Sequence, residues 1–405
     1  MEALVIFLIA LLIGSSHLDV GEGQSNTFNI VNFGAVGDGK TDDSGAFLKA
    51  WQALCGTKGA TVTLEIPASK TFLISQSDLS GPCSSSSIQI KILGNIVAPE
   101  AMAWKGSKEC WLCFREVNGL FLYGSGQING NGASWWTQGK GAERPTALHL
   151  HACNNLKLDG LTHLNSQMNH IGVHHCNGVS ISNLHIYAPG DSPNTDGIDI
   201  SGSTQVYISD CFIGTGDDCI AIKGGSSNIN ITKITCGPGH GISIGSLGEG
   251  GKNENVEQVY VRDVIFNATK NGARIKTAPG GSGYARTISF EEITLINTRY
   301  PVEIDQRYCN GKAHTCSDKG QAVAVSDVTY RGIHGTSSDE QAIYLDCSSN
   351  SGGCTRITIE NVNITLSTFP LTKTLQVICN NAHGKAIHTQ PVVSCLLPGF
   401  KRPFI

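Results

Sequence analysis

The sequence lacks most of the extreme features that would place it quickly. Its 29 Lys and Arg and 33 Asp and Glu give a formal net charge of −4, so no overall positive charge predicts binding to nucleic acid or to an anionic membrane. No linker, low-complexity run or block of like charge divides the 405 residues. The 48 glycines show no collagen period. These absences favour a single folded domain with a substantial core.

Only the N-terminus carries a long apolar run. Residues 3–13 are apolar and residues 14–16 are small, which matches the core of a signal peptide and is too short to span a bilayer. The usual basic residues before such a core are missing, and Glu2 stands there instead. We expect residues 1–22 to be a signal peptide and residues 23–405 to form one secreted domain without a membrane segment.

Fifteen cysteines in an exported chain predict disulfide bonds. Close spacing suggests six pairs, although spacing alone does not fix the connectivity. The suggested pairs are Cys219/Cys236, Cys309/Cys316, Cys347/Cys354, Cys379/Cys395, Cys110/Cys113 and Cys55/Cys83. The remaining cysteines, at 153, 176 and 211, fall at expected strand edges, where a buried thiol fits. The chain lacks a second pair spaced like 110 and 113, so no zinc site is expected.

Residues 34–41 match the phosphate-binding pattern G-x-x-x-x-G-K-T, with an expected strand before and an expected helix after. We reject a nucleotide site, because nucleotide is scarce outside the cell and no parallel α/β pattern follows. Asp38, Asp42 and Asp43 would also repel phosphate. We expect a turn leading into an N-terminal capping helix, with Thr41 or Asp42 as its cap. Sequons at 230, 267 and 363 fit export but also occur by chance.

From about residue 115 the sequence repeats. Short apolar-x-apolar segments begin at residues 120, 156, 179, 206, 229, 259, 288, 323 and 357, the last eight at steps of 23 to 35 residues. A second alternating segment follows by 13 to 20 residues, at 171, 198, 220, 242, 273, 302 and 343. Alternation gives each strand one inward and one outward face. The pattern predicts an all-β fold, a single-stranded right-handed parallel β-helix whose coils stack about 4.8 Å apart.

A β-sandwich or a propeller is the alternative fold. It is disfavoured because residues of like kind recur at one register position instead of alternating across hairpins. Pairs such as Asn177-Gly178 and Asn271-Gly272 then act as turns between coil strands rather than as hairpin turns. We expect residues 27–115 to cap the N-terminal end and residues 355–405 to close the other end.

Three titratable residues occupy one register position of successive coils. Asp196, Asp218 and His240 each stand two residues before the first apolar residue of the second segment. In a solenoid such neighbours lie roughly 5 Å apart, and Asp217 stands beside Asp218. Like charges this close cannot all stay ionised, so we expect one carboxyl to be protonated near neutral pH. A protonated acid beside a base suits acid–base hydrolysis.

Two cations extend this row on the next coil. Arg274 and Lys276 occupy outward positions of one strand, and paired cations suit a substrate that carries carboxylates. Each short phrase alone would be an ordinary turn or solvated strand, but their common register on four coils argues against coincidence. Three acids could instead bind Ca²⁺; the histidine and the cations argue against it. The histidines at 151, 163, 170, 174 and 175 are predicted to be surface or satisfied groups.

Four phrases carry a family resemblance. Asn194-Thr195-Asp196, Gly216-Asp217-Asp218, Gly239-His240-Gly241 and Arg274-Ile275-Lys276 resemble the four signatures of polygalacturonases, the glycoside hydrolase family 28 pectinases, most closely those of plants. The resemblance implies a right-handed parallel β-helix that hydrolyses α-1,4-linked galacturonic acid with inversion and without a metal or other cofactor. It also implies site roles: Asp217 as general acid, Asp196 and Asp218 activating water, His240 supporting them, and Arg274, Lys276, Tyr308 and Asn194 binding substrate.

We therefore expect a secreted, monomeric enzyme that acts on pectin in the plant cell wall, with a slight preference for endo over exo action. The closest rivals are an exopolygalacturonase and a rhamnogalacturonan or xylogalacturonan hydrolase. A Ca²⁺-dependent pectate lyase and a non-catalytic pectin-binding protein are more distant. Inverting enzymes hold their carboxyls about 6.5–9.5 Å apart, whereas adjacent coils offer about 5 Å; on inversion the expectation follows the family.

Overall fold

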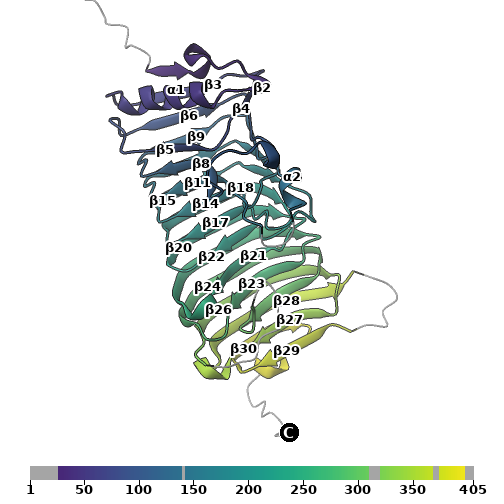
Figure 1. The fold of residues 1–405 in the computed structure, drawn as a ribbon. Coiled ribbons are helices and arrows are strands. Elements are labelled where there is room, and N and C mark those ends of the chain that lie inside the picture. Colours follow the sequence, from purple (N-terminus) through teal and green to yellow (C-terminus); the bar gives the residue numbers. More distant parts are fainter. Residues whose placement is uncertain (1–25, 139–141, 310–319, 368–373, 397–405) are drawn as a thin grey trace, which may run out of the picture.

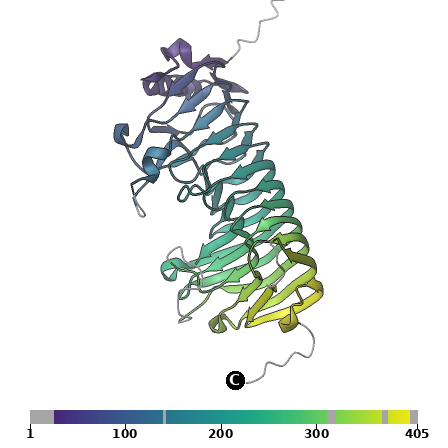
Figure 2. The same ribbon diagram turned by 90° about the vertical axis from the view of Figure 1, so that its right-hand side faces the viewer.

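The computed structural model describes residues 26–138, 142–309, 320–367 and 374–396. The expected signal peptide and Cys316 lie outside these residues. Parallel strands stack along one axis, from the helix α1 (Ser44–Gly56) at one end to the last strands at the other (Figure 1). Turned by 90°, the coils form one continuous column (Figure 2). The predicted parallel β-helix is confirmed.

Two parallel sheets build the column. Sheet B has eleven strands: β5 (Ser77–Ser80), β8 (Cys110–Arg115), β11 (Thr146–His151), β14 (Ile171–His174), β17 (Ile198–Ser201), β19 (Ile220–Ile222), β21 (Ile242–Leu247), β23 (Asn271–Thr277), β25 (Tyr300–Asp305), β27 (Gln341–Asp346) and β29 (Gln376–Asn380). In β17 to β25 the expected inward residues stand in register, as Ile198, Ile220 and Ile242 illustrate. Sheet B carries the predicted site.

Sheet A has nineteen strands and supplies two segments of most coils. They are β1 (Thr27–Asn29), β2 (Asp38–Asp42), β3 (Val62–Ile66), β4 (Thr71–Leu73), β6 (Ile88–Ile92), β7 (Asn95–Val97), β9 (Leu120–Tyr123), β10 (Gln127–Asn129), β12 (Leu156–Asp159), β13 (Thr162–Leu164), β15 (Asn177–Ser182), β16 (His185–Tyr187), β18 (Thr204–Gly214), β20 (Ser226–Cys236), β22 (Asn253–Asn267), β24 (Ser282–Thr298), β26 (Ala324–Ser337), β28 (Cys354–Leu366) and β30 (Ala382–Gln390). From β18 onward the two segments form one long strand, since β15 and β16 both pair with it.

One of the predicted strand positions is wrong. The central part of β24 begins at Ile288, which pairs with Val328 and not with Val323. Both candidates are fully buried, so hydrophobicity alone does not separate them. The backbone conformation does separate the two valines, because a residue with φ between 53° and 73° directly precedes the first apolar residue of each central segment. These residues are Asn155, Gly178, Gln205, Asn228, Gln258, Thr287, Asp327 and Arg356.

The ends of the stack differ from the prediction. The coils begin at β1, which pairs with β3, and β3 pairs with β6, so residues 27–115 are not a separate cap. Within the described residues, α1 covers the N-terminal end through its buried face of Phe47, Ala50, Trp51 and Leu54. At the other end β30 still pairs with β28. Each end strand finds a parallel partner, and the regular stack extends further than the apolar repeat indicates.

The α1 cap was also predicted wrongly. Asp43, not Thr41 or Asp42, stands at the N-cap, and its side chain makes no capping bond. Its carboxylate instead accepts hydrogen bonds from the backbone N–H groups of Val36 (2.7 Å) and Gly37 (3.1 Å). The stretch that resembles a phosphate loop is a turn followed by β2. The carboxylate of Asp43, and not a phosphate, accepts the backbone N–H groups of this turn. The other described helices are α2 (Ala133–Trp136) and short 3-10 turns at Ile30–Phe33, Ala101–Ala103, Glu249–Gly251, Ser349–Ser351 and Ser394–Leu396.

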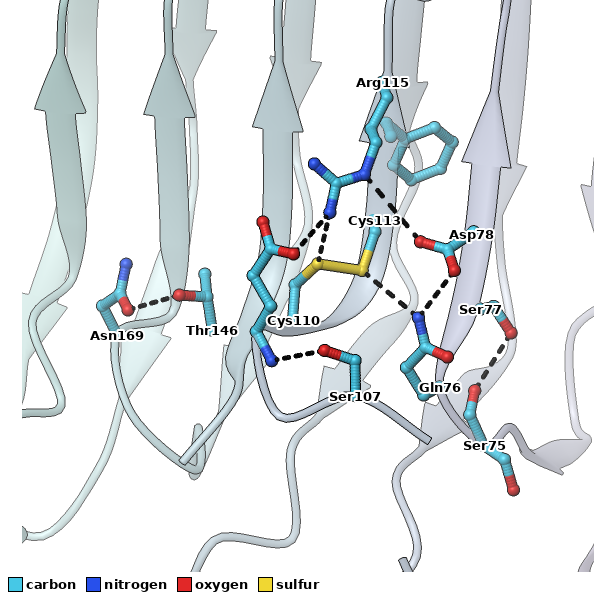
Figure 3. The surroundings of a disulfide bond; sticks show 12 residues. Ser75, Gln76, Ser77, Asp78, Ser107, Cys110, Cys113, Arg115, Thr146 and Asn169 are labelled. Atoms are coloured by element: carbon cyan, nitrogen blue, oxygen red, sulfur yellow. Dashed lines mark hydrogen bonds and ion pairs between the residues drawn. A yellow bond between two sulfur atoms is a disulfide. The ribbon is translucent and has the colours of Figure 1, made fainter. Parts of the chain in front are cut away.

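Disulfide bonds join neighbouring parts of the stack. Five of the six suggested pairs are present: 55 with 83, 110 with 113, 219 with 236, 347 with 354, and 379 with 395. The predicted partner of Cys309 lies outside the described residues. The cysteines at 153, 176 and 211 are free and buried, as expected. Figure 3 shows the Cys110–Cys113 bridge of β8 beneath Arg115, whose Nη2 lies 3.7 Å from the sulfur of Cys110.

Candidate active site

The predicted site lies where four neighbouring strands of sheet B begin. The strands β17, β19, β21 and β23 are paired in order, so residues two positions before their first inward residue form a row. Asp196, Asp218 and His240 occupy this row, and Asn271 continues it. The structure therefore brings together the acids and the imidazole named from the sequence. Their individual partners, however, differ from one acid to the next.

Asp217 is the carboxyl that contacts the imidazole. His240 Nδ1 lies 2.8 Å from Asp217 Oδ1, and both side chains are about a quarter exposed, at 25% and 23%. Burial raises the pKa of Asp217, but the hydrogen bond from His240 lowers it, and the result is below the ordinary value. Asp217 is thus the accessible acid of the cluster, and without substrate it is ionised.

Asp218 points the other way and is fully enclosed by donors. Arg274 Nη2 donates to its Oδ1 (2.5 Å) and Lys276 Nζ to its Oδ2 (2.8 Å). Ser243 Oγ also donates to Oδ1 at 3.0 Å while accepting from Arg274 Nε at 2.9 Å. Burial raises the pKa of Asp218, but Lys276 and Arg274 lower it far more, to well below its usual range. Asp218 stays ionised.

The ion pairs with Asp218 give the two cations a role that the sequence did not indicate. Arg274 and Lys276 were expected to face an anionic substrate, but only 4% and 5% of each is exposed. Arg274 still lines the cleft, and Lys276 Nζ lies 5.2 Å from the ring centroid of Tyr308. Their first task in the free protein is to hold Asp218. Strand spacing could not reveal this, because it does not say which way adjacent carboxyls turn.

Asp196 is the carboxyl with the raised pKa. It is buried, and burial together with the charges of Asp199, Asp217 and Asp218 raises its pKa well above the ordinary value. Asp196 is therefore the acid of the cluster that holds a proton most readily, which is the role expected of one carboxyl. Asp199 also has a raised pKa, because burial outweighs the attraction of Lys223. Neither Asp199 nor Lys223 was assigned a role from the sequence, although both stand at outward positions of the same strands.

The cleft has two parts that meet at Asn194. The downstream pocket, about 300 Å³, is lined by Asn194, Asp217, His240, Lys270, Asn271, Arg274, Arg299, Tyr300, Glu303, Tyr308 and Gln341. The upstream pocket, about 620 Å³, is lined by Ser107, Lys108, Glu109, Ala142, Glu143, Arg144, Met168 and Asn194. Both lie along the starting ends of the strands of sheet B. Asp217 and His240 consequently line the downstream pocket, which adjoins the upstream pocket at Asn194.

Asn194 and Tyr308 take the positions expected of cleft residues. Asn194 is exposed, has a left-handed backbone with φ 54°, and accepts a hydrogen bond on Oδ1 from Arg144 Nη2 at 2.8 Å. Arg144 Nη1 also donates to the carbonyl of Pro193 at 2.6 Å. Burial raises the pKa of Tyr308 to about 12, so its hydroxyl stays protonated. No sequence motif pointed to Arg144, which fixes the turn before Asp196.

The histidine prediction is wrong for two residues. His163 and His170 are only 1% exposed, both ring nitrogens of His163 and Nε2 of His170 lack a hydrogen-bond partner, and burial lowers both pKa values. His163 stands in register between the inward residues Ile128 and Ile186. It is therefore a core residue, not a surface or satisfied one. The other three histidines are partly or fully exposed, in line with the prediction.

A cation would have to compete for the acids of the site. Asp217, Asp218 and His240 offer ligand atoms within 4.8 Å of one another. Both carboxylate oxygens of Asp218 already accept from a guanidinium, an ammonium and a hydroxyl. The second group of this kind among the described residues, Glu109, Cys110 and His149, includes a sulfur that is locked in a disulfide. The donor set at the cleft therefore fits proton transfer better than metal binding.

Carboxyl groups flanking an open cleft are typical of enzymes that hydrolyse glycosidic bonds. Residues 55–390 match the family described as glycosyl hydrolases family 28, and the chain belongs to this family of glycoside hydrolases. None of the helices in the described ranges is long and apolar enough to cross a membrane.

Individual relatives agree with this placement. A probable polygalacturonase of Arabidopsis thaliana is 48% identical over 92% of this chain and 81% of its own length. Polygalacturonase-2 of Solanum lycopersicum is 40% identical over 96% of this chain and 86% of its own length. Among solved structures, the endo-xylogalacturonan hydrolase of Aspergillus tubingensis is 27% identical, covers 88% of this chain and 96% of its own, and superposes with a TM-score of 0.76.

Proposed function

We propose that the protein hydrolyses α-1,4-galacturonosyl linkages of polygalacturonate and pectin. One observation carries the proposal: the accessible pair Asp217–His240 lines the pocket that adjoins the upstream pocket at Asn194, beside an acid held by two cations. The names of the curated plant relatives support the same substrate class. The xylogalacturonan hydrolase likeness keeps a decorated galacturonan as the second candidate.

Asp217 acts as the general acid. It lines the downstream pocket, whereas Asp218 has no free oxygen to offer. In the free protein His240 keeps the pKa of Asp217 low. A substrate carboxylate brought into the cleft raises that pKa, because like charges disfavour a second anion. The protonated Asp217 then gives its proton to the glycosidic oxygen as the bond to the anomeric carbon breaks.

In its ionised form Asp196 takes the proton of the attacking water. Its raised pKa makes it the strongest base of the three carboxylates, while Asp218, whose oxygens are held by Arg274, Lys276 and Ser243, fixes these groups at the cleft and accepts no proton. Water attacks the face opposite the leaving oxygen, so an α-linkage yields a β-anomer. Every residue in this scheme belongs to the chain, and the scheme requires no cofactor. Arg274 and Tyr308 lie on the cleft wall, where they contact a galacturonate residue.

The cleft favours endo action. An exo enzyme closes one end of its cleft next to the catalytic acid, whereas here pockets lie on both sides of Asn194, and Asp217 lines the downstream one. We further propose that residues 1–22 are a signal peptide and that residues 23–405 form one secreted catalytic domain, which works as a monomer on pectin in the plant cell wall.

The experiment is to digest polygalacturonate in the presence of EDTA and to identify the products. We expect new reducing ends, no unsaturated sugar, and β-anomers as the first products in a proton NMR time course. Unsaturated products, or activity lost to the chelator and restored by Ca²⁺, would instead identify a lyase. Binding of polygalacturonate without any cleavage would leave only a pectin-binding protein.

A further inference from the structure

The two halves of the cleft present different charges to a substrate. The downstream pocket contains three cations, Lys270, Arg274 and Arg299, and two acids, Asp217 and Glu303, with two tyrosines. The upstream pocket contains two acids, Glu109 and Glu143, and two cations, Lys108 and Arg144. Formal charge alone makes the upstream pocket neutral. What a sugar meets there depends on which of these charges are free.

The upstream cations are committed to other partners. Arg144 is only 6% exposed, and its Nη1 and Nη2 donate to the carbonyls of Gln167 (3.0 Å) and Pro193 (2.6 Å) and to Asn194 Oδ1 (2.8 Å). The ammonium of Lys108 lies 5.7 Å from the ring centroid of Trp135, a cation–π distance. Three of the four terminal N–H bonds of Arg144 thus have acceptors among the described residues, and the ammonium of the exposed Lys108 lies beside an aromatic ring.

The upstream acids remain at the surface. Glu109 is exposed and paired with Arg115 at 2.9 Å, and that hydrogen bond lowers its pKa, so it is ionised. Glu143 is exposed, and none of the recorded hydrogen bonds or ion pairs in the described part of the chain involves its side chain. Beside them Met168 is 38% exposed and Ala142 is partly buried. Glu143 is therefore the upstream acid without a charged partner in the described part of the chain, and an incoming sugar meets its carboxylate beside a small apolar surface.

We propose that the upstream pocket takes a galacturonosyl residue whose carboxyl is methyl-esterified, and that Glu143 discriminates there against the free carboxylate. This inference rests on the proposed action on pectin. A carboxylate about 4 Å from Glu143 in water-like surroundings loses roughly fivefold in binding through repulsion. An ester carries no charge, and its methyl group packs on the thioether of Met168. The downstream pocket keeps its demand for a free carboxylate through Arg274, Lys270 and Arg299.

The test compares kcat/KM on fully de-esterified polygalacturonate and on the same polymer after partial methyl esterification. For Glu143→Gln we expect the ratio of the two values, de-esterified over esterified, to rise about fivefold, in line with the repulsion that is removed. For Glu143→Lys we expect a larger rise. Both effects shrink at high salt, because the charges are exposed. Glu292→Gln, an exposed glutamate on sheet A, is the matched control and leaves the ratio unchanged.

Two results would overturn the inference in different ways. If Glu143→Gln and Glu143→Lys show the wild-type ratio of kcat/KM on the two polymers, the upstream pocket does not discriminate between the ester and the free carboxylate. The proposed hydrolase function would then still stand. If the wild-type protein cleaves neither polymer, the proposed function fails and the inference falls with it. Because Glu143 is exposed and unpaired, circular dichroism and thermal melting of both variants are expected to match the wild type.

Discussion

The upstream and downstream halves of the cleft are built on the same parallel sheet, yet they hold their arginines differently. Downstream, Arg274 pairs with the buried Asp218 and still borders the cleft. Upstream, Arg144 donates to two backbone carbonyls and to Asn194 and holds a turn in place. The partners of a cation, more than its presence in a pocket, decide what it does in the free protein: Arg274 neutralises a buried acid, and Arg144 holds a turn.

Replacing the acid where the two halves meet has the largest expected effect. In Asp217→Asn the amide cannot donate the required proton, so kcat falls by about 10²- to 10⁴-fold. The side chain is partly exposed, and the melting temperature is expected to stay close to the wild-type value. Steady-state hydrolysis of polygalacturonate measures the effect, and a near-normal kcat would remove Asp217 from the mechanism.

Loss of the downstream arginine comes next and acts on stability as well as on turnover. Arg274→Ala leaves the buried Asp218 with Lys276 as the cation hydrogen-bonded to it in the described residues, and breaking a buried pair of this kind costs about 3–5 kcal/mol. Denaturant unfolding measures this loss. Asp218→Asn alone and the double variant Arg274→Ala, Asp218→Asn complete a double-mutant cycle, and because the two residues are paired the double variant should lose less stability than the sum of the two single losses. If the two losses simply add, the pairing is not the cause.

The upstream arginine offers the matched comparison. Arg144→Ala removes hydrogen bonds to neutral acceptors and leaves no buried charge without a partner, and water from the pocket that Arg144 lines can replace the lost donors. We expect a smaller loss of unfolding free energy than for Arg274→Ala, together with a lower kcat because Asn194 and the turn before Asp196 lose their support. An equal or larger loss of stability than in Arg274→Ala would break the comparison.

The pH dependence tests the electrostatics around Asp196. Its pKa is raised by burial and by neighbouring acids, Asp199 first among them. Asp199→Asn removes a negative charge, which favours the anion of Asp196 and lowers its pKa. Because Asp196 must be ionised to accept a proton, the acidic limb of the kcat/KM profile should move to lower pH. A limb that stays in place or moves to higher pH would exclude Asp196 as the titrating base.

Peripheral cations should give the smallest effects. Arg299 borders the downstream pocket, with its guanidinium 4.8 Å from the ring of Tyr300 and 3.2 Å from Asp339. We expect Arg299→Ala to raise KM for polygalacturonate a few-fold, and Lys108→Ala upstream to raise it less. Both changes should fade at high salt, since exposed charges are screened. A larger rise in KM for Lys108→Ala than for Arg299→Ala would mean that the upstream half, and not the downstream half, binds the free carboxylates.

Much of this site could be predicted from the sequence, because strand register follows directly from period-two alternation. The inward residues from Ile171 to Ile343 were placed correctly, so Asp196, Asp218 and His240 were placed in one row. The resemblance added residue roles that register alone does not supply. Five disulfide pairs also followed from close spacing.

The predictions that were wrong depend on features that the alternation of apolar and polar residues does not contain. Asp217 and Asp218 are adjacent, and only the folded backbone shows that the first turns to His240 and the second to Arg274. His163 counts as polar in a sequence, yet it stacks in the core between isoleucines. Val323 and Val328 are equally apolar, and the left-handed Asp327 marks the true segment. Arg144 lies on a turn without a repeating pattern and gave no signal.

The most direct test of the account is the size distribution of the earliest products from long polygalacturonate. A cleft that binds substrate on both sides of Asp217 predicts a broad range of oligomers and a rapid fall in viscosity at low conversion. Release of monomer alone, with viscosity nearly unchanged, would contradict the two-sided cleft and with it the division into upstream and downstream halves.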